Sequence, residues 1–167
     1  QSFDVNENPQ LSGTLPSQLV AASSLTHLFM FGARISGTLP AAALSSAHVL
    51  QEIELSNCRI SGTLPPDGLP ASMRFVFLES NKLSGSIPSS LGRLRRLREL
   101  ELSKNKFSGS LPGRVAHMRL DHLDVGSNGR LTGVPKQTTK QGCSGGADKY
   151  LRGQPLRQPE QTSRADQ

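Results

Sequence analysis

The hexapeptide LSGTLP at residues 11–16 returns as ISGTLP at 35–40 and 60–65, as LSGSIP at 83–88 and as FSGSLP at 107–112. A shortened copy, LTGVP, follows at residues 131–135. The glycines of these copies stand at positions 13, 37, 62, 85, 109 and 133, so the repeat is nearly constant in length. A fixed period of this size predicts a solenoid, in which each repeat buries its apolar side only by stacking on its neighbours.

A short alternating segment precedes each copy of the motif. Its paired apolar residues are Phe3 and Val5, Leu28 and Met30, Ile53 and Leu55, Val76 and Leu78, Leu100 and Leu102, and Leu123 and Val125. This alternation predicts a strand with one side in the core and the other side facing away from it.

One position after each alternating segment is expected to satisfy the backbone of the following turn. It is occupied in turn by Asn8, Ala33, Cys58, Asn81, Asn105 and Asn128. A stacked Asn amide can donate to and accept from that backbone. Cys58 is expected to be a small buried residue with a weak donor. Ala33 offers no hydrogen bond, so we expect the ladder to be weakest in the second copy.

These positions follow the pattern L-x-x-L-x-L-x-x-N-x-L with a period near 24, so residues 1–135 resemble the leucine-rich repeat. The S-G-x-L/I-P ending is similar to that of the plant-type subclass. The resemblance implies an α/β repeat fold: a right-handed arc with a concave parallel β-sheet and an irregular or short-helical convex side.

The resemblance also implies a function. The chain looks like part of the ectodomain of a plant-type receptor-like kinase or receptor-like protein. This resemblance implies a signalling role and an extracellular or cell-surface location. It also implies that a full-length protein could be anchored in a membrane. The cysteine pairs that usually flank such arrays are missing, which favours a fragment. The repeats are similar to those of kinetoplastid surface antigens as well, so adhesion is an alternative.

The composition changes after Pro135. Residues 136–167 are rich in Gln, Gly and Pro and contain few apolar side chains, which predicts a disordered polar tail with Cys143 as an exposed thiol. No stretch of the chain is apolar over the roughly 18 residues that a membrane span needs.

Catalytic and cofactor motifs are missing from the sequence. It contains no phosphate-binding loop, nucleophile elbow or kinase signature, and no nucleophile motif accompanies its four histidines. We therefore predict no enzyme activity and no cofactor, although a kinase domain could belong to a longer chain. The chain carries a net charge of +6, but Arg93, Arg95, Arg96 and Arg98 are interpreted as a solvated convex cluster, and no nucleic-acid partner is predicted.

The strand residues that face away from the core define what we call the concave face. The central row is Asp4, Phe29, Glu54, Phe77, Glu101 and Asp124, and flanking rows two residues before and after add Glu52, Phe75 and Glu99, and Phe31 and Glu79. We expect these side chains to be solvent-exposed. Contiguous exposed aromatics mark contact surfaces. The predicted partner-binding residues are Phe29, Phe31, Glu52, Glu54, Phe75, Phe77, Glu79, Glu99, Glu101 and Asp124.

This face is expected to bind a protein or peptide that carries positive charge and apolar anchors. The alternative is a structural repeat scaffold with no fixed ligand. Glu99, Glu101, His122 and Asp124 should lie close together on adjacent strands, where oxygen and imidazole ligands suit a divalent cation. Because no ligand motif supports such a site, we interpret them as an acidic cluster with an incidental His and predict no metal.

Overall fold

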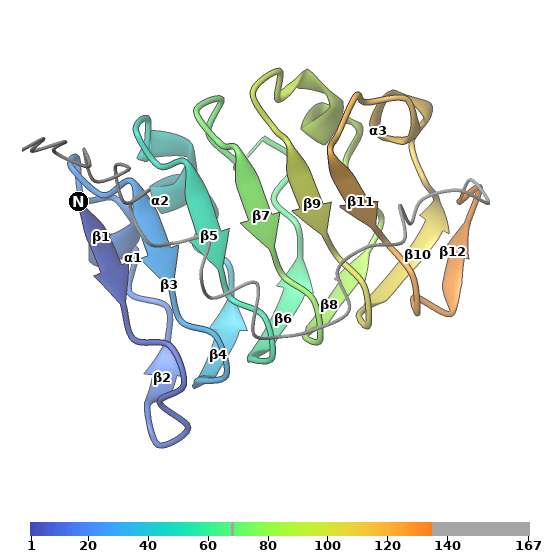
Figure 1. Cartoon of the computed structure of the whole chain (residues 1–167). Helices are drawn as coiled ribbons and strands as arrows, with labels where there is room; N and C mark the ends of the chain where they lie inside the picture. Colours follow the sequence, from blue (N-terminus) through green and yellow to red (C-terminus); the bar gives the residue numbers. More distant parts are fainter. Residues whose placement is uncertain (68, 135–167) are drawn as a thin grey trace, which may run out of the picture.

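The computed structural model describes residues 1–67 and 69–134, so the predicted tail and Cys143 lie outside the described residues. Two sets of short strands alternate along the chain (Figure 1). The first set is β1 (Ser2–Asp4), β3 (His27–Phe29), β5 (Glu52–Glu54), β7 (Phe75–Phe77), β9 (Glu99–Glu101) and β11 (His122–Asp124). The second set is β2 (Ser12–Thr14), β4 (Arg34–Thr38), β6 (Arg59–Thr63), β8 (Lys82–Gly85), β10 (Lys106–Ser110) and β12 (Arg130–Thr132).

The first set of strands forms one parallel sheet in the order β1-β3-β5-β7-β9-β11. Each strand is one alternating segment, and equivalent residues of successive repeats pair, as Leu28 does with Ile53 and Ile53 with Val76. The predicted solenoid of parallel strands is therefore confirmed, and so is the register that defines the concave face.

The SGT segments form a second parallel sheet, in the order β12-β10-β8-β6-β4-β2, which the repeat pattern did not predict. Gly62 has a φ of +83°, and a β-carbon there would lie 2.9 Å from the Cγ2 of Thr38 in the preceding repeat. The hydroxyl of Ser61 donates to the carbonyl of Gly37 at 3.2 Å. The Ser-Gly-Thr sequence is thus a repeat-to-repeat contact as well as a bend.

Short helices lead the chain away from the second sheet on the convex side. They are α1 (Ser17–Val20), α2 (Ala41–Ser46), the 3₁₀ helix η1 (Ser89–Arg93) and α3 (Gly113–Ala116). Each begins directly after the proline of the hexapeptide. Proline has no N–H to donate, so it is well placed at a helix start, where that donor has no helical partner. Within the described residues, no helix is long and apolar enough to cross a bilayer.

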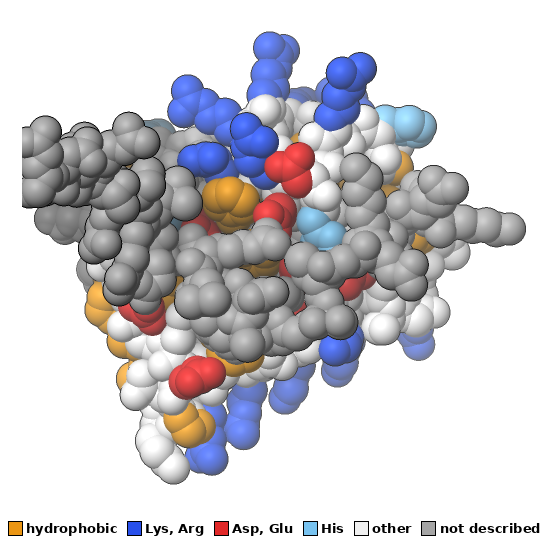
Figure 2. Space-filling model, in the orientation of Figure 1, with side chains coloured by type: hydrophobic (Ala, Val, Ile, Leu, Met, Phe, Trp, Pro, Cys, Tyr) orange, Lys and Arg blue, Asp and Glu red, His pale blue; other side chains and the backbone are white. Residues whose placement is uncertain are grey.

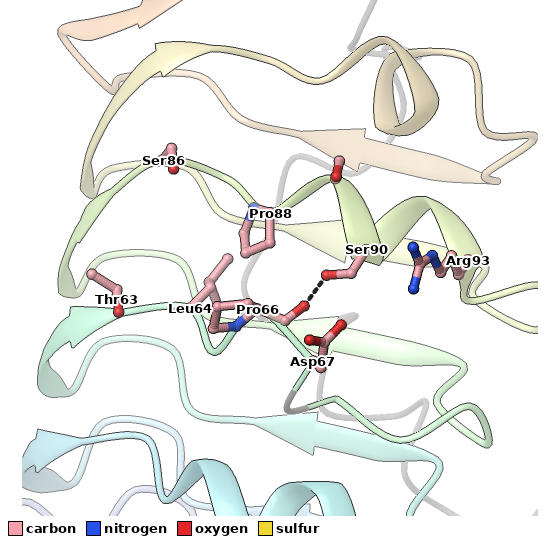
Figure 3. A pocket seen from close by; sticks show the side chains of 9 residues that line it. Thr63, Leu64, Pro66, Asp67, Ser86, Pro88, Ser90 and Arg93 are labelled. Atoms are coloured by element: carbon pink, nitrogen blue, oxygen red, sulfur yellow. Dashed lines mark hydrogen bonds between the residues drawn. The ribbon is translucent and has the colours of Figure 1, made fainter.

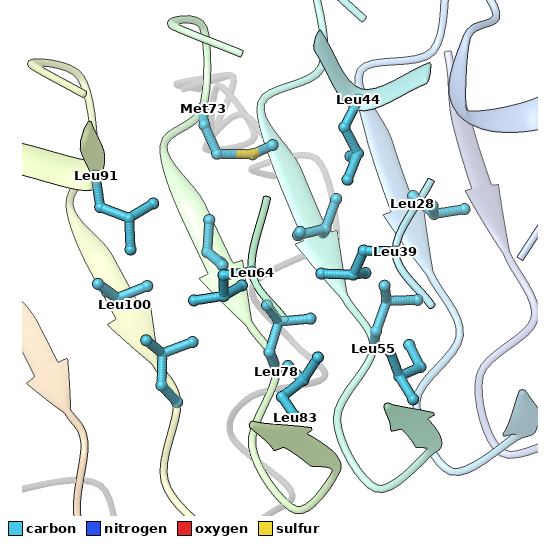
Figure 4. Packing of buried hydrophobic residues seen from close by; sticks show 14 of the residues in the cluster. Leu28, Leu39, Leu44, Leu55, Leu64, Met73, Leu78, Leu83, Leu91 and Leu100 are labelled. Atoms are coloured by element: carbon cyan, nitrogen blue, oxygen red, sulfur yellow. The ribbon is translucent and has the colours of Figure 1, made fainter. Parts of the chain in front are cut away.

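A leucine-rich core runs between the two sheets and the helices (Figure 4). Leu28, Ile53, Val76 and Leu100 contribute fully buried side chains from the first sheet, and Leu44 closes the core from α2. Because equivalent positions stack from repeat to repeat, the core is continuous along the array.

The asparagine ladder links successive repeats. Asn105 accepts a hydrogen bond from the backbone N–H of Leu83 at 3.0 Å and donates to the carbonyl of Leu78 at 2.8 Å, both in the preceding repeat. The thiol of Cys58 keeps one such link, to the carbonyl of Met30 at 3.2 Å. Ala33 is buried and has no side-chain donor or acceptor, so the ladder is interrupted in the second copy, as predicted.

Candidate functional site

The concave face brings aromatic and acidic residues together in alternation. Across β3, β5, β7, β9 and β11, the central row runs Phe29, Glu54, Phe77, Glu101, Asp124, each paired in register with the next. The row before it runs His27, Glu52, Phe75, Glu99, His122. Phe31 and Glu79 follow their strands and extend the face toward the turns.

The predicted exposure of this face is wrong for six of the ten candidate residues. Phe29 and Phe77 are only 6% and 5% exposed, and Glu52, Glu54, Glu99 and Glu101 are buried too. The two rings lie outside the leucine core, so the predicted face is correct and only the exposure differs. Neighbouring strands are about 4.8 Å apart, so side chains on adjacent strands shield part of one another's surface.

Stacking of aromatic rings contributes to this cover. The rings of Phe75 and Phe77 lie 6.4 Å apart between centroids and are nearly parallel, with 11° between their planes. The remaining candidates, Phe31, Phe75, Glu79 and Asp124, are half-buried and keep part of their surface accessible.

Several carboxylates of this face have internal hydrogen-bond or ion-pair partners. Glu54 Oε1 accepts from the backbone N–H of Ser56, and Asp124 Oδ1 accepts from that of Gly126, both at 2.9 Å. Glu101 Oε1 lies 3.6 Å from His122 Nε2. These contacts fix the acidic side chains before any partner arrives.

Glu52 is the electrostatically perturbed residue of the site. Burial, and after it the negative charges of Glu54 and Glu99, raise the pKa of its carboxyl to about 7 against an opposing contribution from Arg74. His27 Nε2 lies 3.9 Å from Glu52 Oε2. The pKa of His27 is lowered by burial and by the positive charges of the N-terminus and Arg74. Glu52 therefore titrates near neutral pH, and the negative charge of the face depends on pH.

The predicted acidic cluster is assembled. Glu99 pairs in register with His122, and Glu101 with Asp124. Among the described residues, however, no group of three or more His, Cys, Asp or Glu side chains is arranged to hold a metal ion.

A hollow lies on the convex side between two successive repeats (Figure 3). Asp67 and Ser86 line it together with Ser90 and Arg93 of η1, and the hydroxyl of Ser90 donates to the carbonyl of Pro66. The residues that line it contain no Cys or His, so they offer no nucleophile paired with an imidazole base.

Comparison with known families identifies the repeat. The family model described as Leucine Rich Repeat matches residues 49–69, 72–94 and 96–118, which span the third, fourth and fifth strands of the first sheet. The chain is a leucine-rich repeat protein. A search of curated proteins found no match.

Solved structures similar to this leucine-rich repeat protein come from plant receptors. The plant peptide hormone receptor RGFR1, solved with RGF2, is 34% identical with a TM-score of 0.68, over 74% of this chain and 20% of the receptor chain. The BIR3–SERK2 complex of Arabidopsis thaliana gives 35% identity and a TM-score of 0.68, over 74% of this chain and 65% of the matched chain.

The Arabidopsis receptor kinase HAESA, solved with the peptide hormone IDA and the co-receptor SERK1, is a third similar structure. It is 30% identical with a TM-score of 0.70, over 78% of this chain and 22% of the matched chain. The leucine-rich repeat array described here thus spans about a fifth of the two hormone-receptor chains. The plant-type character of the repeats is confirmed by these neighbours.

One contributor to the site was missed from the sequence of the leucine-rich repeats. The guanidinium of Arg74 lies 5.3 Å from the centre of the Phe75 ring, a cation–π distance. Arg74 precedes β7 and therefore falls outside the strand alternation that defined the candidate rows. The sequence did contain a signal for this contact, namely a basic residue directly before a strand that contains two Phe residues.

Proposed function

We propose that the concave face recognises a protein or peptide with positive charge and apolar anchors, as part of a cell-surface or secreted receptor-like protein. The proposal rests on one observation, the register that alternates Phe and Glu across β3, β5, β7 and β9. This register places the half-buried Phe75 between Glu52 and Glu99, so a partner that contacts the accessible part of the ring also approaches carboxylates. We propose a binding module rather than an enzyme.

The half-buried rings supply the apolar part of this recognition. Phe75 keeps accessible surface while its ring is held by stacking on Phe77 and by Arg74. A ring fixed before binding loses little side-chain freedom on contact, and aromatic anchors of this kind dominate binding energies.

The carboxylates supply the charge. A cation that approaches Glu52 favours the ionised carboxylate and lowers its pKa from about 7, so binding releases a proton. We therefore propose that affinity for a basic partner rises with pH through neutrality.

The similar structures support a peptide or protein partner and an extracellular location. RGFR1 and HAESA were solved with peptide hormones, and HAESA also with a co-receptor. Membrane anchoring and a signalling role are part of the same proposal.

A scaffold or adhesion role without a fixed ligand is the second candidate. It is favoured by the internal bonds of Glu54 and Asp124, which give these acids a structural purpose in the turns. Under this alternative, the carboxylates serve to accept hydrogen bonds from backbone N–H groups, and they do not bind a ligand.

Selection from a random peptide library tests the proposal. The full chain is immobilised, and enriched peptides are then measured by fluorescence anisotropy against wild type, Phe75→Ala and the convex control Arg95→Gln/Arg96→Gln. We expect peptides rich in Lys or Arg with Phe or Leu, whose affinity falls about thirtyfold for Phe75→Ala, as for an anchor worth about 2 kcal/mol. Equal affinity for all three proteins, or no enrichment, would support the scaffold.

A further inference from the structure

Five basic residues occupy one equivalent position in five successive repeats. Each is the first residue of a second-sheet strand, and each is exposed: Arg34, Arg59, Lys82, Lys106 and Arg130. Because β4, β6, β8, β10 and β12 are neighbours in that order, the five side chains form a continuous row. We call this row the basic edge.

The spacing of the basic edge follows from the register. Arg59 pairs with Ser36, and Lys82 pairs with Ser61, so each basic residue lies two residues out of step with the one before it. With strands about 4.8 Å apart and a rise of about 3.3 Å per residue, successive α-carbons are about 8 Å apart and the row is about 30 Å long.

The surroundings leave this positive charge uncompensated by neighbours. In the part of the chain that the structure describes, the ion pairs are His27–Glu52, Arg98–Asp121 and His122–Glu101, and none involves the basic edge. Within residues 31–38, 55–64, 78–87, 102–111 and 125–133, Glu79 is the single acidic residue. Figure 2 shows Lys and Arg side chains along the edge below β4–β10, and a second group at the opposite edge.

Serine hydroxyls accompany the cations. Ser36, Ser61 and Ser84 stand two residues after Arg34, Arg59 and Lys82, and each hydroxyl donates its proton to a glycine carbonyl of the preceding repeat. Their oxygen atoms remain able to accept a hydrogen bond from a ligand hydroxyl.

We propose that the basic edge binds a linear polysaccharide that carries sulfate or carboxylate groups along its length. Regularly spaced cations match regularly spaced anions, and the serine oxygens suit sugar hydroxyls. A single-stranded nucleic acid fits less well, because such sites stack bases on accessible aromatic rings. These segments contain two aromatic residues, of which Phe31 is half-buried and Phe107 is fully buried. This site is separate from the acidic concave face and does not depend on its proposed role.

The test compares two charge-matched variants of the full chain. Arg59→Gln/Lys82→Gln/Lys106→Gln removes three charges from the basic edge, and Arg93→Gln/Arg95→Gln/Arg96→Gln removes three from the opposite edge. The probes are heparin oligosaccharides and oligogalacturonates of increasing length, with single-stranded DNA of equal charge as the competing class. Binding is measured by isothermal titration calorimetry at several salt concentrations, and circular dichroism verifies folding of both variants.

We expect at least one glycan series to bind, with affinity rising with length until the ligand spans the row. Loss of the basic-edge charges should weaken binding on the order of tenfold to a hundredfold and flatten the salt dependence, since fewer counterions are released. The opposite-edge variant should bind within about twofold of wild type, because its cations lie in and directly after η1 and not in the row. Equal losses in both variants, tighter binding of DNA, or no glycan binding at 0.15 M salt would overturn the proposal.

Discussion

Replacing Asn105 with Ala tests the asparagine ladder where it links the fifth repeat to the fourth. Asn105 provides the hydrogen-bond partner that the structure gives to the buried N–H of Leu83, at 3.0 Å. The carbonyl of Leu78 retains a second donor, the amide of Asn81 at 3.2 Å, so one backbone group rather than two is orphaned. An orphaned buried N–H costs about 1–3 kcal/mol, and the other lost bonds add about 1 kcal/mol, so we expect a loss of about 2–4 kcal/mol.

Asn8→Ala is the matched control. Asn8 occupies the same repeat position but is exposed, and its amide donates only within its own turn, to the carbonyls of Val5 and Asn6. Its removal should cost less than about 1 kcal/mol. Urea unfolding followed by circular dichroism gives both free energies, and amide exchange should accelerate at Leu83 in Asn105→Ala. Equal costs for the two variants, with Leu83 still protected, would refute the ladder argument.

Three further substitutions probe the core, the second sheet and the titration of the concave face. Leu78→Ala should destabilise the fully buried centre of the core by about 2–5 kcal/mol and broaden the thermal unfolding transition, whereas an unchanged melting curve would contradict the strand register. Gly62→Ala forces a non-glycine residue to a φ of +83° against Thr38, so it should lower the urea midpoint more than Gly113→Ala, a site with open space around it. Glu52→Gln should stabilise the protein at pH 8 but not at pH 4. The carboxyl of Glu52 has a folded-state pKa of about 7, so the stability of the wild-type protein falls as pH rises toward 7. Urea midpoints of variant and wild type that differ by the same amount at both pH values would contradict this expectation.

The first sheet was predictable because its signal is repeated six times. Period-two alternation at pairs such as Ile53 and Leu55 assigns each residue to a face, and the constant period then stacks the strands in register. The second sheet was not predictable in the same way. Its strands, such as Arg59–Thr63, are polar beyond Ile60, and they are held by serine-to-carbonyl bonds and close contacts at glycine, which leave no apolar alternation.

The composition of the candidate site could be predicted, but its exposure and electrostatics could not. Alternation places Phe77 and Glu54 on the concave face, but it does not say how neighbouring side chains cover them. The pKa of Glu52 depends on that cover and on Glu99, a residue distant in sequence. The link from Glu54 to the N–H of Ser56 depends on turn geometry, which the repeat pattern does not specify.

The central claim is that the concave face is the recognition surface, and photo-crosslinking locates a bound peptide most directly. An enriched basic peptide carrying a benzophenone group is irradiated with the full chain, and the adducts are mapped by mass spectrometry. The account predicts adducts within residues 27–31, 52–56, 75–79 and 99–103, the strands of the first sheet and the residues that follow them. Adducts concentrated in α1, α2, η1 and α3 on the convex side would contradict it.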